Sequence, residues 1–169
     1  MVDTARHDTW SSGDSYELYM GRWSRKIAAR FLDLFACEAG RDWLEVGCGT
    51  GALTSAILAR AEPARLVAVE PSDAFLQSAR TAIEDPRVTF LQGDAQDLPQ
   101  EDGSTDVVTS GLVLNFVPDR PRALAEMRRV LRPGGRLGFY VWDYPGGAAS
   151  ASSAPSGRPR WRLTPQPRT

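Results

Sequence analysis

The feature that most constrains the fold is an apolar segment that breaks into closely spaced glycines. Residues 44–51 read LEVGCGTG, and an apolar pattern resumes over residues 52–58. This order predicts a strand, a tight loop and a helix. Gly47, Gly49 and Gly51 would permit the positive φ angles of a sharp turn and would let a ligand touch the backbone. The N-terminus of the helix would point free N–H groups and a partial positive charge at that ligand.

A second apolar segment, residues 65–70, ends on the carboxylate of Glu70. At the end of a parallel strand this carboxylate could accept hydrogen bonds from a ribose diol, as in open sheets that bind nucleosides. The glycine spacing is G-x-G-x-G, whereas dinucleotide-binding loops have G-x-G-x-x-G. Glu45, just before the loop, would repel a pyrophosphate but suits a ligand that carries an ammonium group. The two segments therefore disfavour a dinucleotide.

Three later segments follow these two in an informative order. Residues 88–99 read as a third strand ending in a polar loop, and residues 105–116 as a fourth strand with its following loop. Residues 131–137 read as a turn, Leu-Arg-Pro-Gly-Gly, that leads into a fifth strand. The five motifs span about residues 40–142. In this order they resemble the motifs of the class I S-adenosylmethionine-dependent methyltransferases.

The resemblance implies the cofactor S-adenosyl-L-methionine. It also implies an α/β fold, a doubly wound Rossmann-like methyltransferase sheet, mostly parallel, which here would lack the usual last two strands. In similar proteins an acid at the position of Asp94 accepts a hydrogen bond from the adenine amino group, and an N-terminal tyrosine and arginine cover the amino-acid end. Tyr19 and Arg22 could do so, although Tyr19 could instead pack on the first helix and Arg22 remain solvated. The predicted cofactor-binding residues are Glu45, Gly47, Gly49, Gly51, Glu70, Asp94, Ala95, Gly111, Tyr19 and Arg22.

The segment after the predicted fourth strand bears on the methyl acceptor. Family members that methylate exocyclic or amide nitrogens often carry Asn/Asp-Pro-Pro-aromatic there, whereas residues 110–113 read SGLV. Base-flipping DNA methylation is therefore disfavoured, and a net charge of −1 provides no footprint for nucleic acid. The resemblance favours a small-molecule acceptor. Asn115 and Phe116 are candidate acceptor-pocket residues, with a place in the core as the alternative for Phe116. No catalytic residue is assigned, because methyl transfer needs mainly alignment and desolvation.

Composition limits the other classes of protein. With 169 residues, 42% of them hydrophobic, the chain can build one domain around one core. Cys37 and Cys48 fall in a predicted helix and in the glycine loop, which argues against a disulfide framework and favours a reducing cytoplasm. The polar N-terminus does not read as a secretory signal, and no apolar run approaches membrane-spanning length. His7 is the only histidine, so a metal site built on histidines is excluded.

Helical periodicity predicts the elements between the motifs. Residues 24–35 carry an apolar stripe that should cover one edge of the sheet. Ser72 should cap the helix that follows it, and Pro121 should occupy the first turn of another helix. The fifth strand is predicted over residues 137–142. The arginines at the end of the last helix are predicted to form a solvated helix face: Arg128, Arg129 and Arg132.

The predicted organisation has three parts. Residues 1–23 form an N-terminal segment and cofactor cover, residues 24–145 the cofactor-binding domain, and residues 146–169 a disordered tail rich in Gly, Ala, Ser, Pro and Arg. All but one of the 20 basic residues are arginine, which indicates a GC-rich gene. We therefore expect that the reading frame leaves the family's path near Gly146 through a frameshift or truncation. A basic tail that binds an acidic partner is the alternative.

Two functions follow from these features. The first is transfer of a methyl group from S-adenosylmethionine to a small molecule by a cytoplasmic enzyme. The second is a truncated remnant that at most binds the cofactor. A nicotinamide-dependent oxidoreductase is disfavoured by the glycine spacing and by Glu45. No metal, nucleic acid or membrane partner is expected. Because the strands after the fifth would be missing, we also expect self-association through its exposed edge.

Overall fold

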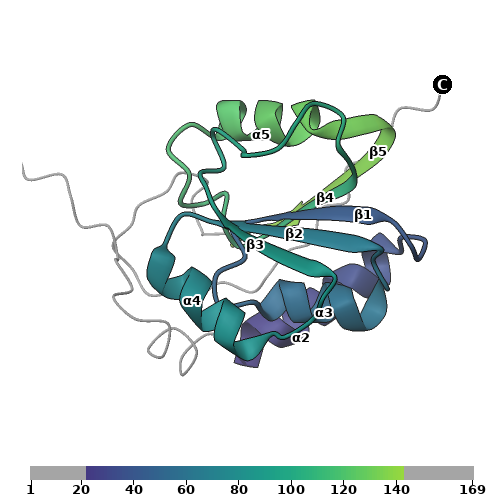
Figure 1. The fold of residues 1–169 in the computed structure, drawn as a ribbon. Helices are drawn as coiled ribbons and strands as arrows, with labels where there is room; N and C mark the ends of the chain where they lie inside the picture. The colour runs from purple at the N-terminus through teal and green to yellow at the C-terminus, as the bar shows by residue number, and fades with distance from the viewer. Residues whose placement is uncertain (1–21, 143–169) are drawn as a thin grey trace, which may run out of the picture.

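A five-stranded parallel sheet forms the centre of the molecule (Figure 1). The computed structural model describes residues 22–142. The strands are β1 (Asp42–Val46), β2 (Arg65–Glu70), β3 (Val88–Gln92), β4 (Thr105–Gly111) and β5 (Leu131–Tyr140). They lie in the order β3-β2-β1-β4-β5, and every neighbouring pair is parallel. The order reverses between β1 and β4, and open α/β sheets bind their ligands at such a switch point.

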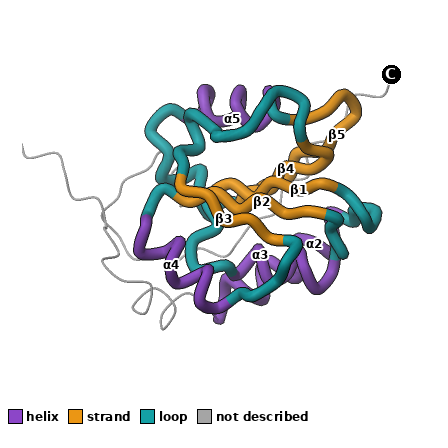
Figure 2. Tube along the Cα trace, viewed as in Figure 1, coloured by secondary structure: helices purple, strands orange, loops and turns teal. Residues whose placement is uncertain are grey.

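Helices cover both faces of this sheet. The bounds of the helices are α2 (Arg22–Phe35), α3 (Ala52–Arg60), α4 (Asp73–Ala82) and α5 (Arg120–Arg129). Figures 1 and 2 show α2, α3 and α4 beneath the sheet and α5 above it. A strand that feeds a helix and then a parallel neighbour gives this layered arrangement. The predicted doubly wound, Rossmann-like fold is therefore confirmed.

The central strands bury side chains on both faces. On β1, Trp43 belongs to the core between the sheet and the helices α2 and α3, whereas Leu44 and Val46 belong to the core between the sheet and α5. On β4, Val107 and Val108 divide in the same way. This two-sided burial explains why these strands are nearly continuous apolar runs in the sequence.

The helix starts follow the sequence signals. Ser72 is the N-cap of α4, and its side chain accepts a hydrogen bond from the backbone N–H of Phe75 at 3.4 Å. Asp119 caps α5 by accepting from the N–H of Arg122 at 3.0 Å, and Pro121 lies in the first turn of that helix. The predictions for Ser72 and Pro121 are confirmed, because each satisfies or removes an N–H that the helix cannot pair internally.

α2 packs against the edge strand β5. The Phe31 and Tyr140 rings lie 5.0 Å apart between centroids. A Cβ on Gly138 would lie 2.5 Å from the Phe35 ring, so only glycine allows the helix to approach the strand this closely. The predicted contact of this helix with one edge of the sheet is confirmed.

The bounds predicted for the fifth strand are wrong. β5 begins at Leu131 and ends at Tyr140, with a register shift opposite Thr105 and Val107. Gly134, at φ 79°, lies within this irregular first half, so the Pro-Gly-Gly turn interrupts a strand that has already begun. Trp142 lies beyond the strand, where its backbone N–H donates to Asn115 Oδ1 at 2.9 Å.

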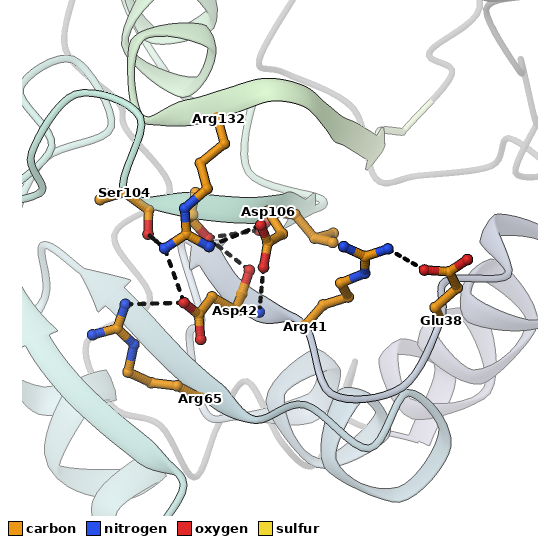
Figure 3. Close-up of polar contacts among 9 residues, drawn as sticks. Glu38, Arg41, Asp42, Arg65, Ser104, Asp106 and Arg132 are labelled. Carbon is orange, nitrogen blue, oxygen red and sulfur yellow. Dashed lines mark hydrogen bonds and ion pairs between the residues drawn. The ribbon is translucent and has the colours of Figure 1, made fainter.

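A network of ion pairs joins the N-terminal ends of β1, β2, β4 and β5 (Figure 3). Arg132 of β5 donates to Asp106 at 2.8 Å, to Asp42 at 3.1 Å and to the carbonyl of Ser104 at 2.8 Å. Asp42 also pairs with Arg65. The prediction that Arg132 belongs to a solvated helix face is wrong. Its guanidinium ties three strands together at the edge opposite the glycine loop.

Arg129, in the last turn of α5, also makes several hydrogen bonds within the protein. It donates to Glu126 at 2.7 Å and to Asp102 at 2.6 Å. It also contacts the carbonyls of Leu98 and Gln100. Of the three arginines, Arg128 is exposed as predicted. Planar guanidinium groups satisfy several acceptors at once, which suits them to loop anchoring.

Two predicted parts of the chain lie outside the described residues. They are the tail, residues 146–169, and nearly all of the N-terminal cover, residues 1–21. The expectation that the last two strands are missing concerns the same undescribed region. None of the helices between Arg22 and Trp142 is long and apolar enough to span a bilayer.

Candidate functional site

The glycine loop between β1 and α3 lies at the carboxyl ends of the central strands. Gly47, Gly49 and Gly51 all have positive φ angles, of 76°, 54° and 91°, a region that side chains disfavour. Their surroundings differ. A Cβ on Gly47 would lie 2.3 Å from Val113 Cγ2, and one on Gly51 would lie 2.5 Å from Ile83 Cδ1. A Cβ on Gly49 would meet no atom within 4 Å. The loop is therefore packed at both ends and open at its centre.

Glu70 is tied to this loop through backbone hydrogen bonds. Its Oε2 accepts from the N–H of Gly49 at 3.0 Å, and its Oε1 accepts from the N–H of Ser72 at 3.1 Å. The residue is 7% exposed. Burial raises the pKa of its carboxyl, and the two N–H donors oppose that rise. Because each carboxylate oxygen has two lone pairs, both oxygens can still accept one further hydrogen bond.

Glu45 is enclosed beneath the loop. It is 1% exposed, and its Oε2 accepts a hydrogen bond from Thr54 Oγ1 of α3 at 2.6 Å. Burial raises the pKa of Glu45 to about 8, and the nearby charge of Glu70 acts in the same direction. The bond to Thr54 joins β1 to the first turn of α3, which fixes both sides of the glycine loop.

Thr109 of β4 is a neighbour that sequence reasoning missed. Glu45 and Thr109 are directly paired across β1 and β4, and paired residues of parallel strands point to the same face. Thr109 is 0% exposed, and its Oγ1 has no hydrogen-bond partner among residues 22–142. Buried hydroxyls are usually paired, so Thr109 stands out as a polar group on the same face as Glu45. Its sequence signal is a hydroxyl residue inside an apolar strand.

Asp94 lies in the loop after β3 and is exposed. Its Oδ1 accepts from the backbone N–H of Gln96 at 2.7 Å, which is the turn that aspartate commonly stabilises. Ala95 is buried beneath this turn. Gln96, which sequence reasoning did not select, accepts from the N–H of Asp119 at 3.0 Å and joins this loop to the start of α5.

Gly111 ends β4 next to the edge strand. A Cβ here would lie 2.4 Å from the hydroxyl oxygen of Tyr140. Leu112 follows with a φ of 64°, uncommon for a branched apolar residue. With this backbone, Leu112 enters the core between the sheet and α2. The next residue, Val113, lies against Gly47. The loop after β4 is therefore fitted against the glycine loop.

The two candidate acceptor-pocket residues differ in their surroundings. Asn115 donates to the carbonyl of Trp142 at 3.1 Å and accepts from its N–H at 2.9 Å, so its amide holds the chain after β5. Phe116 is 60% exposed, and the alternative that placed it in the core is wrong. Arg120 donates to the carbonyls of Leu114 and Asn115, which anchors this loop to α5.

The predicted residues fall into three groups. The glycine loop, Glu45, Glu70, Asp94, Ala95 and Gly111 all lie at or just after the carboxyl ends of neighbouring strands. Arg22 is the first residue of α2. Tyr19 lies outside the described residues. The structure thus brings the first group to the carboxyl ends of the strands, where open parallel sheets bind nucleosides.

Comparison with known proteins agrees with this fold. Residues 44–139 match a family described as "Methyltransferase domain". An uncharacterized methyltransferase of Mycobacterium tuberculosis is 39% identical over 112 residues, which cover 66% of this chain and 44% of that protein. The ubiquinone/menaquinone biosynthesis C-methyltransferase of Dinoroseobacter shibae is 38% identical over 125 residues, which cover 72% of this chain and 50% of that protein.

The solved structures lead to the same family. An S-adenosylmethionine-dependent methyltransferase from Mesorhizobium loti superimposes with a TM-score of 0.61 and 25% identity, covering 70% of this chain and 53% of that chain. The chain belongs to the class I S-adenosylmethionine-dependent methyltransferases, as its motifs predicted. It spans about half the length of the curated relatives it matches.

Proposed function

We propose that this chain binds S-adenosyl-L-methionine at the glycine loop and supports methyl transfer to a small-molecule acceptor. The observation that carries the proposal is that Gly49, which has open space beside its backbone, lies next to Glu70, whose carboxylate is held by hydrogen bonds. The first leaves backbone free of side chains at the centre of the loop. The second holds a carboxylate whose plane is set by two backbone donors. A nucleoside with a ribose diol fits that combination.

The other predicted residues would complete the cofactor site. Asp94, beside the open carboxyl end of β3, would accept from the adenine amino group, and Ala95 and Gly111 would line the site. Glu45 is too enclosed for a broad contact, so it would act through its charge and through its bond to Thr54. The hydroxyl of Thr109, which has no partner within the described part of the chain, would allow a polar contact on this face of the sheet. Tyr19 and Arg22 would cover the amino-acid end.

The chemistry proposed for the bound cofactor is donation of its sulfonium methyl group to a nucleophile in line with the breaking bond. The contribution of the chain is to hold that methyl and the acceptor in line and to exclude water. The loop of residues 112–118 would form the acceptor side, since Val113 already lies against Gly47. Exposed Phe116 offers an apolar surface there. The acceptor would be a small molecule in the cytoplasm.

The carboxylate of Glu70 provides the first test. Glu70→Ala should weaken binding of S-adenosylhomocysteine by about 1.5 to 3 kcal/mol, the scale for hydrogen bonds to a charged group. Isothermal titration calorimetry measures the affinity, and Glu101→Gln, at an exposed acid away from the loop, is the control. Unchanged affinity in Glu70→Ala would contradict the site.

Turnover is tested separately. A screen of small-molecule acceptors with labelled S-adenosylmethionine distinguishes an active methyltransferase from a chain that only binds the cofactor. Tight binding of S-adenosylhomocysteine with no labelled product across the screen would support the second function.

The outer edge of β5 is proposed to pair with a second copy of this chain. Within residues 22–142, β5 pairs only with β4. Tyr140 is buried, and its carbonyl accepts from Leu112, so the backbone groups of Phe139 face outward. Phe139 is 39% exposed. An unpaired apolar edge favours pairing with another strand. The apolar edge is smaller than the sequence indicated, since Trp142 lies beyond β5.

We expect self-association of the full chain at micromolar concentration. Size-exclusion chromatography with light scattering should show a dimer or larger species, and Phe139→Lys should shift it towards monomer by placing a charge on the edge. The matched control is Phe116→Lys, because Phe116 is the same residue type and is also exposed, at 60%, but lies off the strand. A wild-type chain that stays monomeric at all concentrations would contradict this proposal.

A further inference from the structure

Asp94, the acid proposed to contact the adenine, has its carboxylate held by Gln96. Asp94 Oδ1 accepts from the backbone N–H of Gln96 at 2.7 Å and from its side-chain Nε2 at 3.1 Å. Nε2 also donates to Oδ2 at 3.3 Å. Each carboxylate oxygen has two lone pairs. The contacts made within residues 22–142 therefore occupy both lone pairs of Oδ1 and leave one on Oδ2 for a further donor.

The side-chain amide of Gln96 has one allowed orientation. Its Oε1 accepts from the backbone N–H of Asp119, at the start of α5, at 3.0 Å. A backbone N–H can only donate, so the amide oxygen must face α5. The amide nitrogen must then face the carboxylate of Asp94. The amide thus connects the start of a helix to one carboxylate.

The backbone on either side of this amide is also fixed by α5. Arg122 Nε donates to the carbonyl of Gln96 at 2.8 Å. Two residues further on, the N–H of Leu98 donates to Glu126 at 2.9 Å, and the carbonyl of Leu98 accepts from Arg129 at 3.2 Å. Side chains of α5 therefore hold this loop at two places, before and after its turn. The loop is ordered by the protein itself, which lowers the cost of ordering it around a ligand.

The strand ends place Asp94 beside the acid proposed to bind the ribose. Glu70 and Gln92 are paired across β2 and β3, and the N–H of Gly93 donates to the carbonyl of Glu70 at 3.3 Å. Asp94 is the next residue, so it lies just past the carboxyl end of the strand that neighbours Glu70. Ligands of open parallel sheets lie outside these strand ends. A nucleoside whose ribose binds Glu70 would have its base next to this loop.

We propose that Gln96 is a positioning residue, which orients the carboxylate of Asp94 for a hydrogen bond from the 6-amino group of the purine. The inference rests on the proposed function and deepens it, because it assigns part of the base selectivity to a residue that acts through another. A carboxylate accepts hydrogen bonds and does not donate them, so the remaining lone pair of Oδ2 recognises a donor such as an amino group. Gln96 determines which oxygen is left for that donor.

Two ligands that differ only in the 6-amino group test the inference. Isothermal titration calorimetry compares S-adenosylhomocysteine with its analogue in which hydrogen replaces that group, and the ratio of the two Kd values isolates its contribution. We expect wild-type protein to bind S-adenosylhomocysteine about tenfold more tightly than the analogue. This is the low end for a hydrogen bond to a charged group, because Asp94 is exposed.

Gln96→Glu is the informative variant. It keeps an acceptor for the N–H of Asp119 but places a second carboxylate against that of Asp94, and the two like charges repel. The ratio of Kd values should therefore fall to about twofold or less. The added charge acts on both ligands, and so would a general loss of loop structure. A purely structural role of Gln96 would therefore weaken both ligands and leave the ratio unchanged.

Three further variants assign the effect. Gln77→Glu, the same change at an exposed position of α4, should keep the wild-type ratio. Asp94→Ala should bring the ratio close to one, and adding Gln96→Glu to it should not change the ratio further, because the two residues act as a unit. Gln96→Ala removes the amide without adding a charge and should also lower the ratio.

The possible failures are distinguishable. A wild-type ratio near one would overturn the inference, whether or not any variant folds. A wild-type ratio in both Gln96→Glu and Gln96→Ala would also overturn it, while the proposed cofactor site would stand. If wild-type protein does not bind S-adenosylhomocysteine, the proposed function itself fails.

Discussion

Gly47→Ala is expected to lower the free energy of unfolding by about 2 to 5 kcal/mol, against about 1 to 2 kcal/mol for Gly49→Ala. Both glycines have positive φ angles, so both substitutions carry the cost of a left-handed backbone. A Cβ on Gly47 would also lie 2.3 Å from Val113 Cγ2, whereas one on Gly49 would meet open space. Urea unfolding of the two variants and wild type measures the difference.

Cofactor binding should depend more on Gly49 than on Gly47, which is the reverse of their order in stability. A side chain on Gly49 would point into the open centre of the loop, so Gly49→Val should remove S-adenosylhomocysteine binding in a protein that still folds. The double variant Gly47→Ala/Val113→Ala should recover about 1 kcal/mol or more relative to the sum of the single changes, because the two sites share one contact. Equal stability of Gly47→Ala and Gly49→Ala would contradict the packing. Normal binding by Gly49→Val would show that the loop is structural.

The sequence predicted the elements that depend on local pattern. Apolar runs and glycine spacing located β1, β2 and the loop between them, and Ser72 and Pro121 marked helix starts, because capping and turn chemistry act within a few residues. The order of the motifs along the chain was sufficient to indicate the family. Glu70, Asp94 and Gly111 were selected this way, and the fold brings all three to one edge of the sheet.

What the sequence could not predict depends on contacts between distant segments. The role of Arg132 arises from Asp42, which is 90 residues away. Asn115 was chosen for a pocket, but its amide is occupied by the backbone of Trp142. Thr109 became notable only when the register placed it opposite Glu45. None of these pairings leaves a local periodic signal, since each is fixed by how the strands align.

The pH dependence of stability should reveal the state of Glu45 without any ligand. We expect the free energy of unfolding to fall by on the order of 3 kcal/mol between pH 5 and pH 8. The pKa of Glu45 rises from 4.5 to about 8 on folding. A carboxyl with a raised folded-state pKa contributes stability that is fully present below its unfolded pKa. That stability is lost as pH rises through the folded pKa. Urea unfolding at half-unit pH steps measures the change.

The range from pH 5 to pH 8 is favourable for assigning the change in stability to Glu45. The one histidine of the chain is His7, outside the described residues. Three carboxyls have a lowered pKa, and their contribution to stability is lost as pH falls below about 4: Asp85, Asp106 and Glu126. Glu70 has a raised pKa and acts in the same direction as Glu45. Glu45→Gln should therefore remove most of the fall, with Glu101→Gln as the unaffected control. A Glu45→Gln variant whose stability still falls as steeply as that of wild type would place the buried proton elsewhere and would leave Glu45 ionised beneath the loop.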